Sequence, residues 1–129
     1  MKNILNNKWF NWVLAIVWMV FIFYLSSVSK FPVEFQDPWA SCVSYGAHVF
    51  LYLVLTFLLI RALNFAGLPL KKAVAFAFLI AIIYGATDEF HQSFVPYRSM
   101  SLSDWLVDGA SALVIVYLYN YFCKLKMLK

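Results

Sequence analysis

Ionisable and amide side chains gather at three places in an otherwise apolar chain. They are His48, then a run near residue 90, then two aspartates, with an arginine between the last two groups: Asp88, Glu89, His91, Gln92, Arg98, Asp104 and Asp108. Asp104 and Asp108 are spaced i,i+4, as are Asp88 and Gln92, so each pair would share one face of a helix. Ser44 and Tyr52 stand four residues on either side of His48 and would continue a polar stripe there.

These residue types suit acid–base chemistry or the binding of a polar ligand. Histidine and carboxylate side chains move protons, and arginine binds a phosphate or carboxylate in a bidentate manner. The residues predicted to be catalytic are His48, Glu89, His91, Arg98 and Asp104. Those predicted to bind are Ser27, Tyr52, Asp88, Gln92 and Asp108. Ser26 and Ser44 are further hydroxyls in the same region, but nothing resembles a nucleophile elbow.

A divalent metal is a second possibility for this set. Histidine and carboxylate ligands that come from several helices are common in the metal sites of helical bundles. The chain has no HExxH and no paired CxxC, so the spacing of the residues supports a metal only weakly, and metal dependence stays open.

A purely structural role is the alternative. An ionised group at the centre of a bilayer costs about 2.5–3.5 kcal/mol, so such groups face a bundle interior or a wet cavity. Polar side chains also hold membrane helices together. In this interpretation Arg98 pairs with Asp104 or Glu89, and His48 bonds a carboxylate.

The elements that must position these residues are membrane helices. Of 129 residues, 64% are hydrophobic and 12% are charged, with a mean hydropathy of +0.79, which excludes the polar exterior of a soluble domain. A span needs roughly 20 apolar residues. The sequence predicts one all-α integral membrane domain over 1–129, a four-transmembrane-helix bundle. Its spans cover about 9–28, 45–63, 73–90 and 104–122.

The segments between the spans have recognisable signals of their own. Ser29 to Ser44 contains two prolines and reads as a loop or interfacial segment. Ser101 or Ser103 could cap the fourth helix.

The distribution of charge predicts an orientation. With four spans, both termini and the second loop share a side that carries eight of the ten basic residues: Lys2, Lys8, Arg61, Lys71, Lys72, Lys124, Lys126 and Lys129. The other side has Lys30, Arg98 and all six acidic residues. The positive-inside rule therefore puts both termini in the cytoplasm and the polar residues at the outer face. Basic residues at the ends of spans indicate orientation and anionic lipid, so no nucleic-acid partner is expected.

Two segments resemble the signature of the VanZ-like family. They are 84–98, YGATDEFHQSFVPYR, and 103–109, SDWLVDG. The matching positions are Asp88, Glu89, Gln92, Phe94, Pro96, Arg98, Asp104, Asp108 and Gly109. His48 with Tyr52 resembles the family's His-x-x-x-Tyr, and Ser26-Ser27 its serine pair. Two positions depart from the pattern: Tyr97 stands where glycine is frequent, which puts the loop shape in doubt. Leu113 stands where a small residue is frequent, which puts close helix packing there in doubt.

The resemblance implies a protein of the bacterial cytoplasmic (inner) membrane. The family's namesake is associated with low-level resistance to teicoplanin, a lipoglycopeptide antibiotic. Membrane lipids, and a lipoglycopeptide or lipid-linked cell-wall precursor, are the partners that this would involve. An enzyme that acts on a phospholipid or polyprenyl-linked head group is the first alternative, and a structural or transport protein is the second. Whether the chain is an enzyme, its substrate and its oligomeric state stay open.

Overall fold

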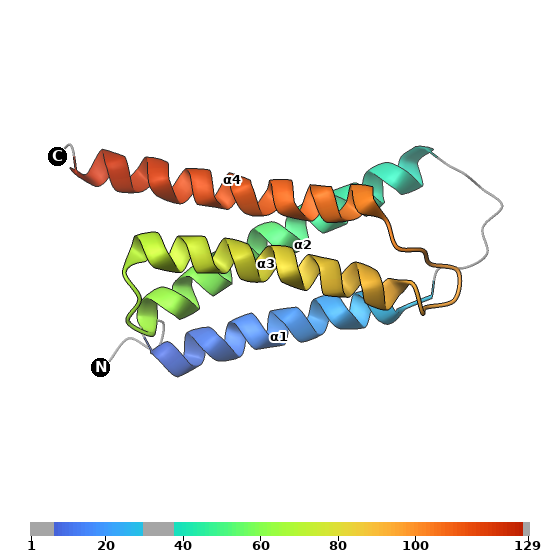
Figure 1. Ribbon diagram of the computed structural model, residues 1–129, viewed down its shortest axis with the longest axis horizontal. Coiled ribbons are helices and arrows are strands. Elements are labelled where there is room, and N and C mark those ends of the chain that lie inside the picture. Colours follow the sequence, from blue (N-terminus) through green and yellow to red (C-terminus); the bar gives the residue numbers. More distant parts are fainter. Residues whose placement is uncertain (1–6, 30–37, 128–129) are drawn as a thin grey trace.

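Four long helices make up the part of the chain that the computed structural model describes, residues 7–29 and 38–127, with side chains over 7–29 and 42–123. They are α1 (Lys8–Ser27), α2 (Pro38–Phe65), α3 (Leu70–Gln92) and α4 (Leu102–Met127) (Figure 1). Each contains a stretch long and apolar enough to cross a membrane. The predicted all-helical architecture with four candidate spans is therefore confirmed.

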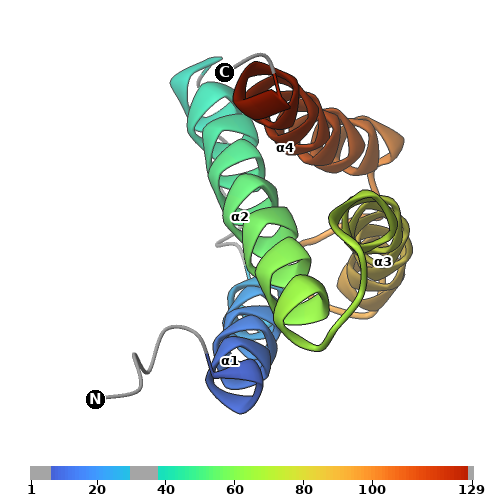
Figure 2. The same ribbon diagram turned by 90° about the vertical axis from the view of Figure 1, so that its left-hand side faces the viewer.

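The helices α2 and α3 form the centre of the bundle. Helix α2 packs against the other three, and α3 packs against α4 and, less extensively, α1. Viewed along the bundle, α1 and α4 lie on opposite sides of the α2–α3 pair (Figure 2). Small residues allow this close packing, since Ala62, Ala73, Ala77, Ala81 and Ala112 are all buried.

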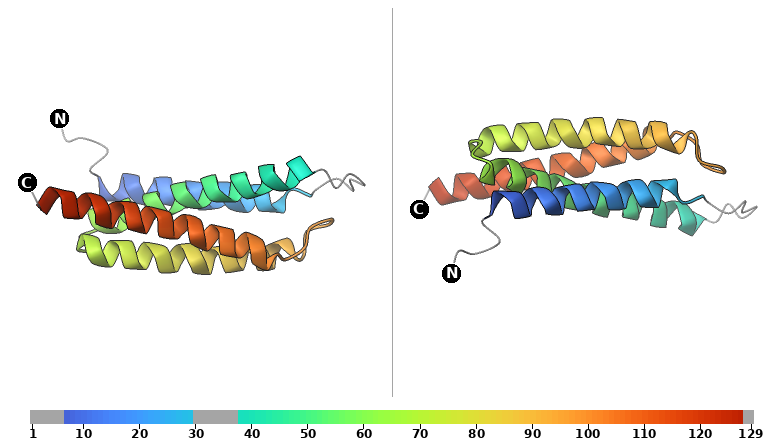
Figure 3. Two further views of the ribbon diagram at one scale, coloured as in Figure 1. Left: turned by 90° about the horizontal axis from the view of Figure 1, so that it is seen from above. Right: turned by 90° about the horizontal axis from the view of Figure 1, so that it is seen from below.

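The two ends of the bundle differ in charge. The helices run along one long axis, with the turn between α2 and α3 at one end and the loop 93–101 at the other (Figure 3). One end, called the basic end here, has the start of α1, the turn between α2 and α3, and the end of α4; it carries Lys8, Arg61, Lys71 and Lys72. The other, the polar end, has the ends of α1 and α3, the starts of α2 and α4, and the loop 93–101. Asp88, Glu89, Asp104 and Asp108 all lie toward it.

Helix α1 shows how an apolar helix selects its inner face. Its buried residues are Asn11, Ala15, Ile22 and Ser26, which recur at spacings of four and seven and so lie along one stripe. Asn7 caps the helix, because its side chain accepts a hydrogen bond from the Trp9 amide at 2.8 Å. Trp12, Trp18 and Met19 are partly buried against the core. Other large side chains of α1, among them Val17 and Val20, are exposed, as expected for a surface that meets lipid.

The prediction of a loop over Ser29 to Ser44 is wrong for its second part, because α2 begins at Pro38. An interfacial position of this part stays a prediction. Proline fits the first position of a helix, where its fixed φ is suitable and its missing N–H is not needed. Residues 30–37 lie outside the described residues. Helix α1 agrees with its predicted span to within one residue at each end. Helices α3 and α4 continue past theirs, as α4 does to Met127, because hydropathy marks the apolar part of a helix rather than its ends.

Gly109 and Leu113, both on α4, have different surroundings. A Cβ at Gly109 would lie 2.8 Å from Ile82 Cδ1, so α3 and α4 approach closely at this point. Leu113 is 54% exposed and lies on the outer surface. The departure from the family pattern at Leu113 therefore leaves this close contact intact.

Candidate functional site

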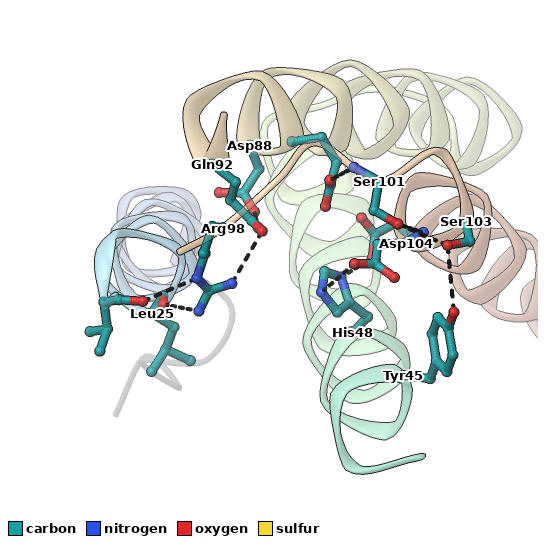
Figure 4. A network of polar contacts seen from close by, with 12 residues as sticks. Leu25, Tyr45, His48, Asp88, Gln92, Arg98, Ser101, Ser103 and Asp104 are labelled. Atoms are coloured by element: carbon teal, nitrogen blue, oxygen red, sulfur yellow. Dashed lines mark hydrogen bonds and ion pairs between the residues drawn. The ribbon is translucent and has the colours of Figure 1, made fainter. Parts of the chain in front are cut away.

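A histidine and three carboxylates from three helices meet at the polar end (Figure 4). His48 of α2 lies with its Nδ1 2.9 Å from Asp108 Oδ1 and its Nε2 3.9 Å from Asp104 Oδ2, both on α4. Glu89 of α3 completes a group in which one potential ligand atom each of His48, Glu89 and Asp104 lies within 4.8 Å of the others. We call these four residues the histidine–carboxylate cluster.

The spacing on α4 brings both aspartates to the same histidine. Asp104 and Asp108 are one helical turn apart, as their i,i+4 spacing predicts. The turn starts at a Ser101 cap, whose Oγ accepts a hydrogen bond from the Asp104 amide at 3.2 Å. Of the two serines predicted as caps, the structure therefore uses Ser101. Trp105 Nε1 donates to the Ile82 carbonyl at 3.0 Å and fastens α4 to α3 beside the cluster.

Gly85 makes room for the cluster on α3. A Cβ at this position would lie 3.3 Å from Asp108 Oδ2, 3.3 Å from Trp105 Cδ1 and 3.4 Å from Tyr52 Cε1. Even a methyl group would therefore crowd three side chains from two other helices. The absence of a side chain at Gly85 lets Asp108 and Tyr52 pack directly against the α3 backbone.

Two carboxylates of the cluster are buried and only partly satisfied. Glu89 and Asp108 are each 1% exposed. Glu89 Oε2 accepts a hydrogen bond from the Ser101 amide at 2.7 Å. Within the described residues, Glu89 Oε1 and Asp108 Oδ2 have no hydrogen-bond partner. Buried polar atoms are usually paired because an unpaired one costs free energy, so these two oxygens are unusual in the interior of the bundle.

A cavity of about 310 Å³ adjoins the cluster and is lined by α1, α2, α3 and Arg98. Its wall combines apolar and polar side chains. The apolar ones are Ile22, Leu25, Val28, Ala47 and Leu51, and the polar ones are Ser26, Ser44, His48, Tyr52, Asp88, Gln92 and Arg98. Among the described residues, three buried oxygens of this wall have no partner: Ser26 Oγ, the Tyr52 hydroxyl and Asp88 Oδ1. The wall of the cavity therefore offers both apolar side chains and hydrogen-bonding oxygens that have no partner among the described residues.

Arg98 holds the loop 93–101 against α1. Its Nε donates to the Val28 carbonyl at 3.0 Å, its Nη2 to the Leu25 carbonyl at 3.0 Å, and its Nη1 to Gln92 Oε1 at 3.1 Å (Figure 4). Gln92 Nε2 in turn donates to Asp88 Oδ2 at 3.0 Å. The predicted ion pair of Arg98 with Asp104 or Glu89 is therefore wrong for the described residues, because the loop aims the guanidinium at the end of α1 instead.

The backbone before Arg98 is unusual. Tyr97 has a φ of +61°, in the left-handed region that glycine adopts without steric cost. A glycine, which is frequent at this place in the pattern, would adopt this φ without strain, whereas Tyr97 adopts it at some strain. Arg98 follows this turn directly and bonds Leu25, Val28 and Gln92.

His91 and Ser27 lie apart from the cluster. Ser27 Oγ is 3.0 Å from His91 Nε2, and the His91 ring lies against the Phe23 ring with centroids 4.3 Å apart. Neither His91 nor Ser27 lines the cavity. The structure thus brings together His48, Glu89, Asp104 and Asp108, places Tyr52, Asp88, Gln92 and Arg98 at the adjoining cavity, and puts His91 and Ser27 on the α1–α3 surface.

Gly85 was not among the predicted site residues, and Ser26 was noted only as a nearby hydroxyl. The signal for Ser26 is present in the sequence, because it continues the buried stripe of Asn11, Ala15 and Ile22, which excludes Ser27. The position of Gly85, one helical turn before Glu89, is a weaker indication that Gly85 belongs to the site. The contacts that make it necessary come from α2 and α4.

The cluster can hold and orient a histidine base. With Asp108 accepting from Nδ1, the Nε2 atom of His48 is left as the acceptor and faces Asp104. This carboxylate–imidazole pair is the arrangement by which proteins orient a general base. His48 also lines the cavity, so the base and the space for a ligand adjoin.

Comparison with known proteins identifies one family. A family model described as VanZ/LLP1 matches residues 10–124, which takes in all four helices and both the cluster and the cavity. Searches of curated proteins and of solved structures gave no match.

Proposed function

The chain belongs to the VanZ-like family, and from this premise we propose that its polar end binds the head group of an envelope amphiphile at the outer face of the cytoplasmic membrane. The ligand is a lipoglycopeptide such as teicoplanin or a lipid-linked cell-wall precursor, and binding it lowers sensitivity to the antibiotic. The mixture of apolar and polar side chains in the cavity wall carries this proposal.

The chemistry of the cavity fits a ligand with both apolar and polar parts. Ile22, Leu25 and Leu51 offer an apolar surface, and Val28, which follows the last residue of α1, is exposed at the cavity. Asp88 Oδ1 accepts hydrogen bonds, and the Ser26 and Tyr52 hydroxyls donate or accept them. Sugar hydroxyls and amino groups are the complementary partners, and lipoglycopeptides and lipid-linked precursors carry such groups beside an acyl or prenyl chain.

Sensitivity to two glycopeptides tests the proposal. The protein is expressed in a susceptible bacterium, and growth is measured with teicoplanin and with vancomycin, which has no lipid tail. We expect protection against teicoplanin, its loss in Asp88→Asn, and its retention in the matched control Asn11→Leu at the basic end. Equal sensitivity with and without the wild-type protein, at verified membrane expression, would count against the proposal.

The orientation can be tested with the two native cysteines. Cys42 is exposed near the start of α2 at the polar end, and Cys123 lies near the end of α4. A membrane-impermeant maleimide added to intact cells should label Cys42 in the Cys123→Ser variant. In the Cys42→Ser variant, the same reagent should label Cys123 only after the cells have been permeabilised. The reverse pattern would place the polar end in the cytoplasm.

A second candidate function is an enzyme that acts on a phospholipid or polyprenyl-linked head group. The observation that favours it is the 2.9 Å contact of His48 with Asp108 beside the cavity, since it would activate His48 as a base. Lipid extracts from cells with wild-type protein and with His48→Gln, compared by mass spectrometry, should then differ in one head-group class. The His91→Gln control should match wild type, and identical extracts from all three strains would remove this candidate.

A further inference from the structure

Three side chains of the histidine–carboxylate cluster converge in the manner of metal ligands. We propose that His48, Glu89 and Asp104 bind a single divalent first-row transition metal ion, with Zn²⁺ as the ion that the donor set fits best. Each of the three residues offers one ligand atom, and these atoms lie within 4.8 Å of one another. The ligands come from α2, α3 and α4, so the ion would join three helices.

The hydrogen bond on the far side of the imidazole prepares His48 to be a ligand. Asp108 Oδ1 lies 2.9 Å from Nδ1 and sets the tautomer that leaves the Nε2 lone pair free. A metal-binding histidine almost always donates its other N–H to a carboxylate, a backbone carbonyl or water in this way. Asp108 is therefore a positioning residue in this site and not itself a ligand.

The separation of His48 and Asp104 suits a shared ion better than a direct bond. The Nε2 and Oδ2 atoms are 3.9 Å apart, beyond the range of a hydrogen bond. Two ligands, each about 2.1 Å from one tetrahedral ion, lie about 3.4 Å from each other. A shift of about half an ångström in either side chain would bring both atoms to an ion.

Glu89 supplies an independent observation that points to a ligand. It is 1% exposed, and one of its oxygens is fixed by the Ser101 amide at 2.7 Å. The other oxygen has no partner in the part of the chain that the structure describes. A buried carboxylate oxygen held in place and left unpaired is costly, and coordination to a cation would satisfy it.

The donor set selects the class of ion. One imidazole and two carboxylates suit Zn²⁺ and its neighbours, whereas Ca²⁺ and Mg²⁺ favour oxygen ligands alone. Three protein ligands leave a fourth position for water or substrate, which is typical of catalytic zinc rather than structural zinc. The side chains of His48 and Asp104 are 12% and 18% exposed, so this position is reachable from outside the bundle.

The metal site goes beyond the proposed binding of an amphiphile and does not depend on it, because metal binding is measured with no amphiphile present. Full-length protein in nanodiscs is stripped with a chelator and titrated with Zn²⁺ against a chromophoric competitor. We expect one tightly bound equivalent per chain. His48→Gln and Glu89→Gln should each weaken binding at least 100-fold, and Asp108→Asn about 10- to 100-fold, as for other residues that orient a ligand.

The matched control is His91→Gln, which removes the other histidine near the same end of the bundle and should bind as wild type does. Circular dichroism and size-exclusion chromatography verify that each variant is folded. Zinc X-ray absorption of the wild-type protein provides a measurement that needs no variant. It should show one imidazole with oxygen ligands and no sulfur.

Three results would overturn the site. They are the absence of a tightly bound equivalent, undiminished binding in folded His48→Gln, and a zinc spectrum without imidazole or with sulfur, which would indicate Cys42 or Cys123. A wild-type protein that binds zinc but gives no protection against teicoplanin would count against the proposed function alone. Failure of the metal site and failure of the proposed function are thus distinguishable.

Discussion

At the basic end, the buried side chain of Asn11 accepts a hydrogen bond from Arg61 Nε at 3.1 Å and donates one to the Asn7 carbonyl at 2.8 Å. At the polar end, Asp88, Glu89 and Asp108 each leave one buried oxygen without a hydrogen-bond partner among the described residues. Both ends carry polar groups inside an apolar bundle. The hydrogen bond between Asn11 and Arg61 joins α1 to α2 at the basic end. At the polar end, several buried oxygens have no hydrogen-bond partner among the described residues.

The two arginines sharpen this difference. Arg61 lies near the rings of Phe57 and Phe65, at 5.9 and 5.6 Å from their centroids, and bonds Asn11. Arg98 is at the polar end, yet it is also used structurally, since three of its N–H groups bond protein oxygens. The polar end therefore contains a structural part around Arg98 and an unsatisfied part around His48. Proximity to a candidate site does not by itself make a residue part of its chemistry.

The largest expected effect on stability comes from Arg98→Gln. It removes charge-assisted hydrogen bonds to Leu25, Val28 and Gln92, and we expect the free energy of unfolding to fall by about 2–4 kcal/mol. Unfolding in mixed detergent micelles, followed by circular dichroism, measures this. Arg98→Lys keeps the charge but has no planar fork for three acceptors, so it should lose nearly as much. Wild-type stability in both variants would show that the loop is held by other contacts.

Asn11→Leu tests the structural role of the basic end. It keeps a similar volume but removes the acceptor of Arg61, and we expect a loss of about 1–3 kcal/mol in the free energy of unfolding. Zinc binding and teicoplanin protection should be retained, because the change lies at the opposite end of the bundle. A folded variant that loses either activity would mean that the basic end takes part in function.

Asp88→Asn tests the unsatisfied part of the polar end. The amide oxygen can still accept from Gln92 Nε2, while a buried charge with one unpaired oxygen is removed. We therefore expect the free energy of unfolding to stay level or to rise by about 1 kcal/mol, together with loss of teicoplanin protection. A destabilisation comparable to that of Arg98→Gln would assign Asp88 to the structural part instead.

His91→Gln should have the smallest effect. His91 lies on the α1–α3 surface against Phe23 and Ser27, where substitutions usually change stability by no more than about 0.5 kcal/mol. Stability, zinc binding and teicoplanin protection should all match wild type. A loss of protection in a stable His91→Gln protein would extend the functional region to this surface.

Local spacing predicted the parts of the site that lie on one helix. Gln92 bonds Asp88 across one turn of α3, and Asp104 and Asp108 both approach His48 from one face of α4. The same reasoning placed His91 with the cluster, because it is close to Glu89 in sequence. Two residues of separation turn a helical side chain by about 200°, however, and His91 faces α1 instead.

The serine pair shows a limit of a different kind. Ser26 and Ser27 are equivalent in composition, but a single residue turns the helix by about 100°, so Ser26 reaches the cavity and Ser27 the surface. The stripe of buried residues in α1 contains this information. It becomes decisive once the neighbours of α1 show which stripe is inside.

The sequence by itself determined that this protein has four membrane-type helices and that the acidic residues of its third and fourth helices share an end, since apolar length and the order of spans settle both. Tertiary structure alone decided which polar groups meet. Arg98 donates hydrogen bonds to the carbonyl groups of Leu25 and Val28 rather than to a carboxylate. His48 of α2 lies close to Glu89 of α3 and to two aspartates of α4. These contacts join residues about 40 to 70 positions apart in the chain. They depend on how closely helices approach at small residues such as Gly85 and Gly109, which no periodicity within a single helix specifies.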